Sequence, residues 1–193
     1  MIKVAVAGNI ASGKSIMEKV LDKNGFVVFD TDMIAHDLLI DTPDIAKAFS
    51  EYDVFEYGRL SREKLGKLVF NDNDLRMKLE SIMYPMIKSE LENAFKVYSD
   101  EKFIFVSVPL LFEAGWESMF DKIVFIKSDD EIRLKRLIQR NGYSEQYAKI
   151  RLNSQKSQDE KCSKSDYVIE NNGSVEEFEQ NVIEFISALS ASV

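Results

Sequence analysis

The stretch Gly8–Ser15, which reads GNIASGKS, limits what this chain can fold into more than any other feature. It satisfies the pattern G-x-x-x-x-G-K-[ST], starts where the apolar run Val4–Ala7 ends, and continues into a helix-compatible stretch from Lys14 to Leu21. Glycines let the backbone curl so that successive N–H groups point at phosphate oxygens, and the helix N-terminus adds its positive dipole end. The sequence therefore predicts a phosphate-binding loop (P-loop) and a nucleotide site.

Two side chains of this loop carry the expected chemistry. Lys14 can bridge the β- and γ-phosphates of ATP, and the Ser15 hydroxyl is a suitable Mg²⁺ ligand. The glycines at 8 and 13 provide the turn. ATP and Mg²⁺ are the cofactors that this pattern predicts.

Four more apolar runs predict the rest of a sheet, at Phe26–Phe29, Phe103–Val106, Ile123–Ile126 and Tyr167–Ile169. The runs are continuous rather than alternating, which indicates strands buried on both faces, as in a parallel sheet covered by helices. More than seventy residues separate the second run from the third, too many for one crossover helix. Apolar residues at helical spacing predict a helical insertion at residues 58–98, with a kink at Pro85, and a final helix after residue 174.

Composition narrows the class of protein. The 193 residues fit one domain, residues 1–193, and the formal net charge of −8 argues against a broad nucleic-acid-binding face. The run Ile2–Ala7 is too short for a signal-peptide core, and no window approaches the length of a membrane span. Cys162 is a single cysteine, which fits a reducing compartment. We expect a cytoplasmic protein without membrane or nucleic-acid partners.

Three classes of P-loop protein compete. A GTPase switch needs a polar residue first in [NT]-K-x-D, but Ile126 stands there, and a motor ATPase needs an acidic strand end where this chain has Ser107. A small-molecule kinase fits better, because Asp30 and Asp32 follow the second strand. In a doubly wound sheet we expect that strand end to lie beside the P-loop, where a carboxylate can accept the proton of an acceptor hydroxyl. The alternative role of Asp32 is to N-cap a helix that starts at residue 33.

Residues 133–165 form a basic window, with nine basic and three acidic side chains and a net charge of +6. Arg133, Arg136 and Arg140 have the spacing of one helical face, and residues 141–165 read as a polar lid. Such a lid can exclude water and bring guanidinium groups to the γ-phosphate, so Arg136 and Arg140 are candidate catalytic residues. A solvated helical face is the alternative.

Several stretches, taken together, resemble the dephospho-CoA kinase family over nearly the whole chain. The Asp-x-Asp-x-Ile-Ala and Pro-Leu-Leu-Phe-Glu pieces are its most specific parts. The matching stretches are 8–15, 29–36, 58–65, 108–113 and 134–140, then Arg151, Gln155 and 166–173.

This resemblance implies an α/β P-loop kinase fold, a five-stranded parallel sheet flanked by helices, with a helical acceptor-binding insertion at 58–98 and a lid at 141–165. It implies transfer of the ATP γ-phosphate to the ribose 3′-hydroxyl of dephospho-CoA, with Asp32 as the base. It also implies nucleotide contacts at Ala11, Ser12, Gly13, Lys14, Ser15 and Ile16, and at Asn172 and Gly173, where the family's chain passes the adenine.

The chain departs from the family pattern at a few positions. Ala11 replaces a common glycine, Ile16 a threonine, Tyr84 a histidine before proline, and Ser107 an aspartate. The alternatives are a kinase for another small acceptor such as shikimate and, outside the enzymes, a nucleotide-dependent regulatory switch. We expect a monomer or a small homo-oligomer.

Overall fold

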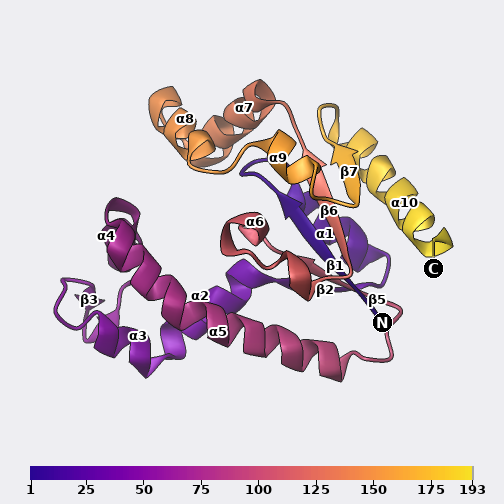
Figure 1. The fold of residues 1–193 in the computed structure, drawn as a ribbon. Coiled ribbons are helices and arrows are strands. Elements are labelled where there is room, and N and C mark those ends of the chain that lie inside the picture. The colour runs from indigo at the N-terminus through magenta and orange to yellow at the C-terminus, as the bar shows by residue number, and fades with distance from the viewer. Residues whose placement is uncertain (193) are drawn as a thin grey trace. The chain divides into compact units, whose positions relative to one another are not determined.

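The computed structural model describes residues 1–192, apart from the side chains at 40 and 41. The chain forms two compact units. The first, here the sheet unit, consists of Met1–Asp30 and the chain from Asp100 onward, and the second, here the insert unit, is Thr31–Ser99. The chain is coloured from N- to C-terminus in Figure 1.

The sheet unit is built on five parallel strands, as the continuous apolar runs predict. They are β1 (Ile2–Gly8), β2 (Val27–Asp30), β5 (Phe103–Ser107), β6 (Lys122–Lys127) and β7 (Tyr167–Glu170), in the order β2-β5-β1-β6-β7. β1 is central, so its side chains Val4–Ala7 are buried. β5 lies between β2 and β1, so the end of β2 is one strand removed from the strand that leads into the P-loop.

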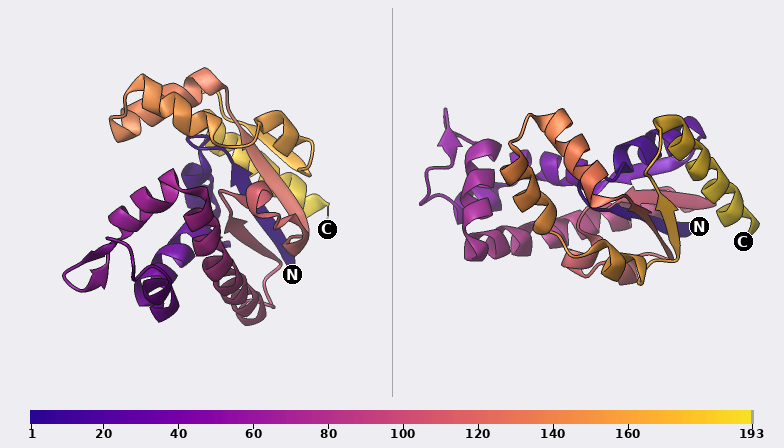
Figure 2. Two further views of the ribbon diagram at one scale, coloured as in Figure 1. Left: turned by 60° about the vertical axis from the view of Figure 1, so that its left-hand side comes forward. Right: turned by 90° about the horizontal axis from the view of Figure 1, so that it is seen from above.

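Helices α1 (Lys14–Lys23) and α10 (Val175–Ala191) lie side by side against the sheet (Figure 1 and Figure 2). Met17 and Leu21 of α1 pack with Phe178 and Val182 of α10 in one core cluster with strand residues such as Phe105. This burial holds the start of α1, and with it the P-loop, on the carboxyl end of β1.

The other helices of the sheet unit are short. They are α6 (Leu111–Ala114), the 3₁₀ turn η1 (Glu117–Met119), α7 (Asp130–Asn141), α8 (Glu145–Asn153) and α9 (Gln158–Cys162). A second core cluster joins Leu137 of α7 to Ala148 and Leu152 of α8, and Ile10 and Ala11 of the P-loop pack against it. The segment read as a lid, residues 141–165, thus contains two helices.

The insert unit contains α2 (Thr31–Asp41), α3 (Pro43–Ala48), the hairpin β3 (Phe55–Glu56) and β4 (Arg59–Leu60), α4 (Arg62–Asn71) and α5 (Asn73–Val97). This unit begins at Thr31 and so includes α2, α3 and β3 ahead of the helical stretch expected at 58–98, and that stretch itself begins with β4. α5 runs through Pro85 as one helix. Its buried side chains are Met83, Ile87, Leu91 and Phe95, a face only partly captured by the sequence spacing.

Within residues 1–192, no helix has both the length and the apolar character needed to cross a membrane.

Candidate active site

The P-loop runs from Gly8, the last residue of β1, to Lys14, the first residue of α1. Gly13 has φ +114°, and a side chain there would collide with the amide of Asn171. At Gly8, a Cβ atom would collide with the Ser12 hydroxyl. Both motif glycines are therefore required by close packing, and Gly13 also by its left-handed backbone.

Ala11 also has a positive φ, +62°, although it is not a glycine. A left-handed conformation costs an alanine about 1–2 kcal/mol. This explains in physical terms why glycine is common at this position of the pattern, and it marks Ala11 as a strained point of the loop.

The N-terminus of α1 is open for an anion, because its N-cap, Gly13, has no side chain to accept from the first N–H groups. Lys14 lies over the loop, where its Nζ donates to the Gly8 carbonyl at 2.6 Å. Ser15 is exposed in the first turn of α1. Amide donors, an ammonium group and a hydroxyl thus gather at one point, which is the chemistry that a triphosphate and its Mg²⁺ require.

Asn171, at the end of β7, ties the P-loop to the neighbouring elements. Its Nδ2 donates to the Ser12 carbonyl at 2.7 Å, and its own carbonyl accepts from Ser128 Oγ at 2.8 Å and from Arg136 Nη1 at 3.1 Å. The side chain is buried. The site prediction passed over Asn171 in favour of Asn172 and Gly173, which are exposed. The burial that marks Asn171 follows from the fold and is not readable from the local sequence.

Asn172 caps the start of α7. Its Oδ1 accepts from the Asp129 backbone N–H at 2.9 Å, and its Nδ2 donates to Asp129 Oδ1 at 3.2 Å. The loop that carries Asn172 and Gly173 is therefore fixed against α7, within the sheet unit.

The three arginines of α7 have different environments, and they do not form one solvated or ligand-facing surface. Arg133 is buried, pairs with Asp130 at 2.7 Å and donates to the Ile10 carbonyl at 3.4 Å. Arg136 is half-buried, and burial lowers the pKa of its guanidinium. It binds Asn171 and Ser128. Arg140 is exposed, with its Nε on Asn141 Oδ1 at 2.9 Å, and is the arginine of the three best placed to meet a ligand.

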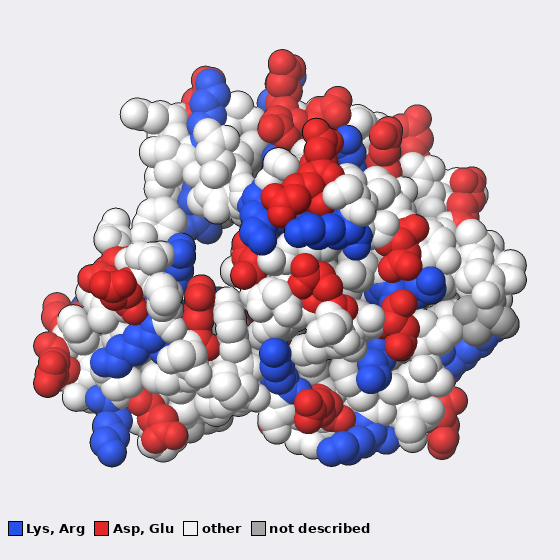
Figure 3. All heavy atoms as spheres, viewed as in Figure 1, with Lys and Arg blue, Asp and Glu red and all other residues white. Residues whose placement is uncertain are grey.

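Ion pairs neutralise part of the positive charge of residues 133–165. They engage several basic side chains of this window in the described part of the chain: Arg133 with Asp130, Lys149 with Glu145, Lys161 with Glu113 and Lys164 with Glu160. On the face drawn in Figure 3, side chains of both signs are interspersed. The positive charge expected at a polyanion is therefore concentrated in fewer groups than the sequence count suggests.

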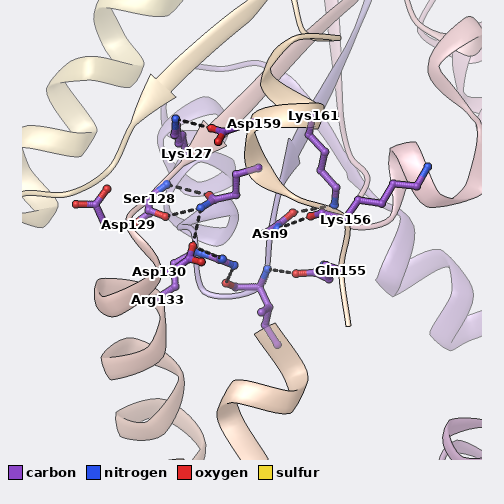
Figure 4. Close-up of polar contacts among 12 residues, drawn as sticks. Asn9, Lys127, Ser128, Asp129, Asp130, Arg133, Gln155, Lys156, Asp159 and Lys161 are labelled. Carbon is purple, nitrogen blue, oxygen red and sulfur yellow. Dashed lines mark hydrogen bonds and ion pairs between the residues drawn. The ribbon is translucent and has the colours of Figure 1, made fainter. Parts of the chain in front are cut away.

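A groove of about 980 Å³ opens beside the P-loop, between the start of α7 and the link from α8 to α9. Figure 4 shows the polar contacts that line it: Lys127 pairs with Asp159 at 3.0 Å, and Gln158 Nε2 donates to the Ser128 carbonyl at 2.8 Å. Two ion pairs lie among the lining side chains of the groove, Lys127 with Asp159 and Arg133 with Asp130.

In the insert unit, Asp32 is exposed in the first turn of α2. Because α2 begins at Thr31, Asp32 lies inside the helix rather than at the N-cap position ahead of residue 33. Its carboxylate is favourable at the positive end of the helix dipole. His36, one turn later, contacts Arg62 Nη1 through Nδ1 at 2.5 Å. Tyr84 is half-buried on α5.

Known proteins match this arrangement along nearly the entire chain. The sequence model of the dephospho-CoA kinase family matches residues 2–177. A dephospho-CoA kinase of Listeria innocua is 35% identical over 189 residues, covering 95% of this chain and 94% of that protein. Among solved structures, the dephospho-CoA kinase of Campylobacter jejuni is 31% identical with a TM-score of 0.76, covering 98% of each chain.

A crystal structure from Thermus thermophilus is 30% identical with a TM-score of 0.87, covering 100% of this chain and 97% of that one. These proteins therefore resemble this chain both in sequence and in fold, over nearly its whole length. The chain belongs to the dephospho-CoA kinase family.

Proposed function

We propose that this chain transfers the γ-phosphate of ATP to the ribose 3′-hydroxyl of dephospho-CoA, giving coenzyme A and ADP. The observation that carries the proposal is the P-loop at the end of β1, with Lys14 over the loop and the open N-terminus of α1 behind it, in a chain whose family match spans residues 2–177. The loop provides hydrogen-bond donors for a triphosphate, and membership of the dephospho-CoA kinase family indicates dephospho-CoA as the phosphoryl acceptor.

The loop residues hold the donor nucleotide. The N–H groups at the start of α1 bind phosphate oxygens, and the Lys14 ammonium moves from the Gly8 carbonyl to the β- and γ-phosphates. Arg140, exposed at the end of α7, stabilises the charge that spreads over the transferring phosphoryl group. Arg136 takes a positioning role, because its donors are used by Asn171 and Ser128.

Asp32 is the proposed general base. It lies two residues past the end of β2, in an exposed helical turn, where its carboxylate can accept the proton of the acceptor hydroxyl as that oxygen bonds to phosphorus. The insertion at 58–98 would hold the rest of dephospho-CoA. The segment 141–165 would cover the nucleotide, with Asn172 and Gly173 beside the adenine.

Mg²⁺ fits the site as a partner of Ser15. Mg²⁺ typically takes few protein ligands and completes its shell with phosphate oxygens and water. An exposed hydroxyl in the first turn after the P-loop lysine suits that pattern. The bound ion would neutralise phosphate charge and leave the protein to orient the two substrates.

The single cysteine and the net charge of −8 support a cytoplasmic enzyme that works on small molecules, as a monomer or a small homo-oligomer. Shikimate-like acceptors and a regulatory switch are the alternatives. Thermal-shift profiles with ATP, GTP, dephospho-CoA and shikimate separate the three. Stabilisation by ATP and dephospho-CoA supports the proposal, whereas stabilisation by shikimate in place of dephospho-CoA, or by GTP alone, contradicts it.

A further inference from the structure

A lysine outside the P-loop is buried against it. Lys161, on α9, is only 1% exposed. Its Nζ donates to Asn9 Oδ1 at 2.7 Å and to Glu113 Oε1 at 2.6 Å. A buried ammonium is unfavourable unless charge and hydrogen-bond partners compensate it, so a lysine placed here depends on both contacts.

The contacts of Lys161 join three segments that are far apart in the sequence. Asn9 is the second residue of the P-loop, Glu113 lies on α6 after β5, and Lys161 lies on α9 (Figure 4 shows Asn9 and Lys161). Glu113 Oε1 also accepts from the Lys156 backbone N–H at 3.2 Å, and Asn9 Nδ2 donates to the Lys156 carbonyl at 3.1 Å. The four residues form one closed polar network.

The link between α8 and α9, which contains Lys156, also binds Ile10, the next residue of the P-loop. Gln155 Oε1 accepts from the Ile10 backbone N–H at 2.7 Å. The first turn of the P-loop is thus fixed from outside, by the link between α8 and α9, at both Asn9 and Ile10. The conformation of this turn determines where the later N–H groups of the loop point, and those groups are the proposed phosphate donors.

We propose that Lys161 is a positioning residue for the nucleotide site, which acts through Asn9. Its ammonium holds the Asn9 amide in one orientation, and Glu113 holds the ammonium. This keeps the first turn of the P-loop in its phosphate-binding form. The role rests on the proposed function. Lys161 would thus affect the affinity for ATP without contacting ATP itself.

The first test compares Lys161→Met with Lys127→Met. Both remove an ammonium group that bridges α9 to another element, but Lys127 pairs with Asp159 at the surface, whereas Lys161 donates to Asn9 of the P-loop. We expect Lys161→Met to raise the Kd for ATP on the order of 10–100-fold, the loss expected when a hydrogen bond to a charged group is no longer well placed. The KM for dephospho-CoA should stay unchanged, and Lys127→Met should bind ATP normally. Equal losses in both variants would overturn the role.

Lys161→Met also leaves the Glu113 carboxylate without its ion-pair partner, and a second test separates this effect from the loss of the Asn9 contact. The double variant Lys161→Met/Glu113→Gln has no such charge, so its Tm should rise above that of the single variant. Its Kd for ATP should remain as high as that of the single variant, because no ammonium group holds the Asn9 side chain in either protein. Recovery of ATP affinity together with stability would show a purely structural role and contradict the proposal.

A third comparison tests the route through Asn9. In an Asn9→Ala background the side-chain amide that Lys161 orients is already absent, so adding Lys161→Met should raise the Kd for ATP little further. If the two substitutions instead raise the Kd by fully additive free energies, Lys161 does not act through Asn9. Calorimetry with ATP alone keeps these outcomes apart from the acceptor reaction. A wild-type protein that bound ATP but made no coenzyme A would contradict the proposed function and leave the Lys161 measurements valid. Wild-type protein without ATP affinity would overturn both.

Discussion

Lys14 is the side chain most directly committed to the nucleotide, since its Nζ lies on the Gly8 carbonyl over the P-loop. Lys14→Ala removes the charge that would meet the β- and γ-phosphates. We expect kcat to fall by a factor on the order of 10²–10³, as for loss of one electrostatic stabilising group, with little change in Tm. Steady-state kinetics and a thermal melt measure the two. Near-normal turnover would show that the P-loop is not the working site.

Asp32 is open to a test that separates chemistry from helix stability. Asp32→Asn keeps the shape of the side chain but removes the charge, which at this first-turn position is worth about 0.3–1 kcal/mol. If Asp32 is the base, kcat should fall by a factor on the order of 10²–10⁴ while the protein stays folded and binds ATP. A folded variant with wild-type kcat would rule out the base role.

Arg136 and Arg140 should respond differently to removal, because only Arg136 is engaged inside the protein. Arg140→Ala should lower kcat and leave Tm unchanged. Arg136→Ala leaves the Asn171 oxygens short of donors and should destabilise the fold by about 1–3 kcal/mol. Parallel measurements of kcat and Tm for both variants decide the assignment. The reverse pattern, with stability lost at Arg140, would contradict it.

These side chains also show the limit of motif reading. The motif predicts Lys14, Ser15 and the two glycines because the chemistry of a phosphate loop requires those residue types at fixed spacing within one short stretch. Asn171 and Lys161 lie more than 150 positions from the loop residues that they bind. Their role depends on which strands become neighbours, and no local spacing reports that.

Among the helices, α10 offers the clearest local signal for its start. Ser174 Oγ accepts from the Glu177 backbone N–H at 3.1 Å, and Glu177 Oε2 accepts from the Ser174 backbone N–H at 2.9 Å, which forms a capping box. Ser174→Ala should reduce the free energy of unfolding by about 1 kcal/mol, with kcat unchanged. Urea denaturation measures the difference. A change below the error of the method would mean that the cap is not used in solution.

Strands and long helices follow from the sequence more reliably than short helices. The five strands are continuous apolar runs, and α10 repeats its apolar residues at steps of three and four. α8 and α9 lack such stripes and are each capped by a serine, Ser144 and Ser157, that accepts from a backbone N–H. A polar stretch with isolated serines gives no periodic signal for a helix, so the sequence indicates only a polar lid at residues 141–165.

For the chain as a whole, family pattern and fold class were predictable, but the internal division was not. The apolar spacing favours an insertion at 58–98, whereas the compact unit starts at Thr31. Residues 31–57 contribute two helices and one strand of a hairpin. The apolar residues of α2, at 33–35 and 38–40, are numerous but are not confined to one helical face, so they give no clear helical period. The place of β5 between β2 and β1 likewise depends on pairing between distant segments.

The central claim is phosphorylation of dephospho-CoA at this P-loop, and one measurement tests it most directly. Purified protein is incubated with ATP, Mg²⁺ and dephospho-CoA, and the nucleotide products are identified by mass and by the position of the new phosphate. The wild type should form coenzyme A and ADP in equal amounts, shikimate should stay unphosphorylated, and Lys14→Ala should form product orders of magnitude more slowly. A wild type that hydrolyses ATP without forming coenzyme A, or that phosphorylates shikimate instead, would contradict the account.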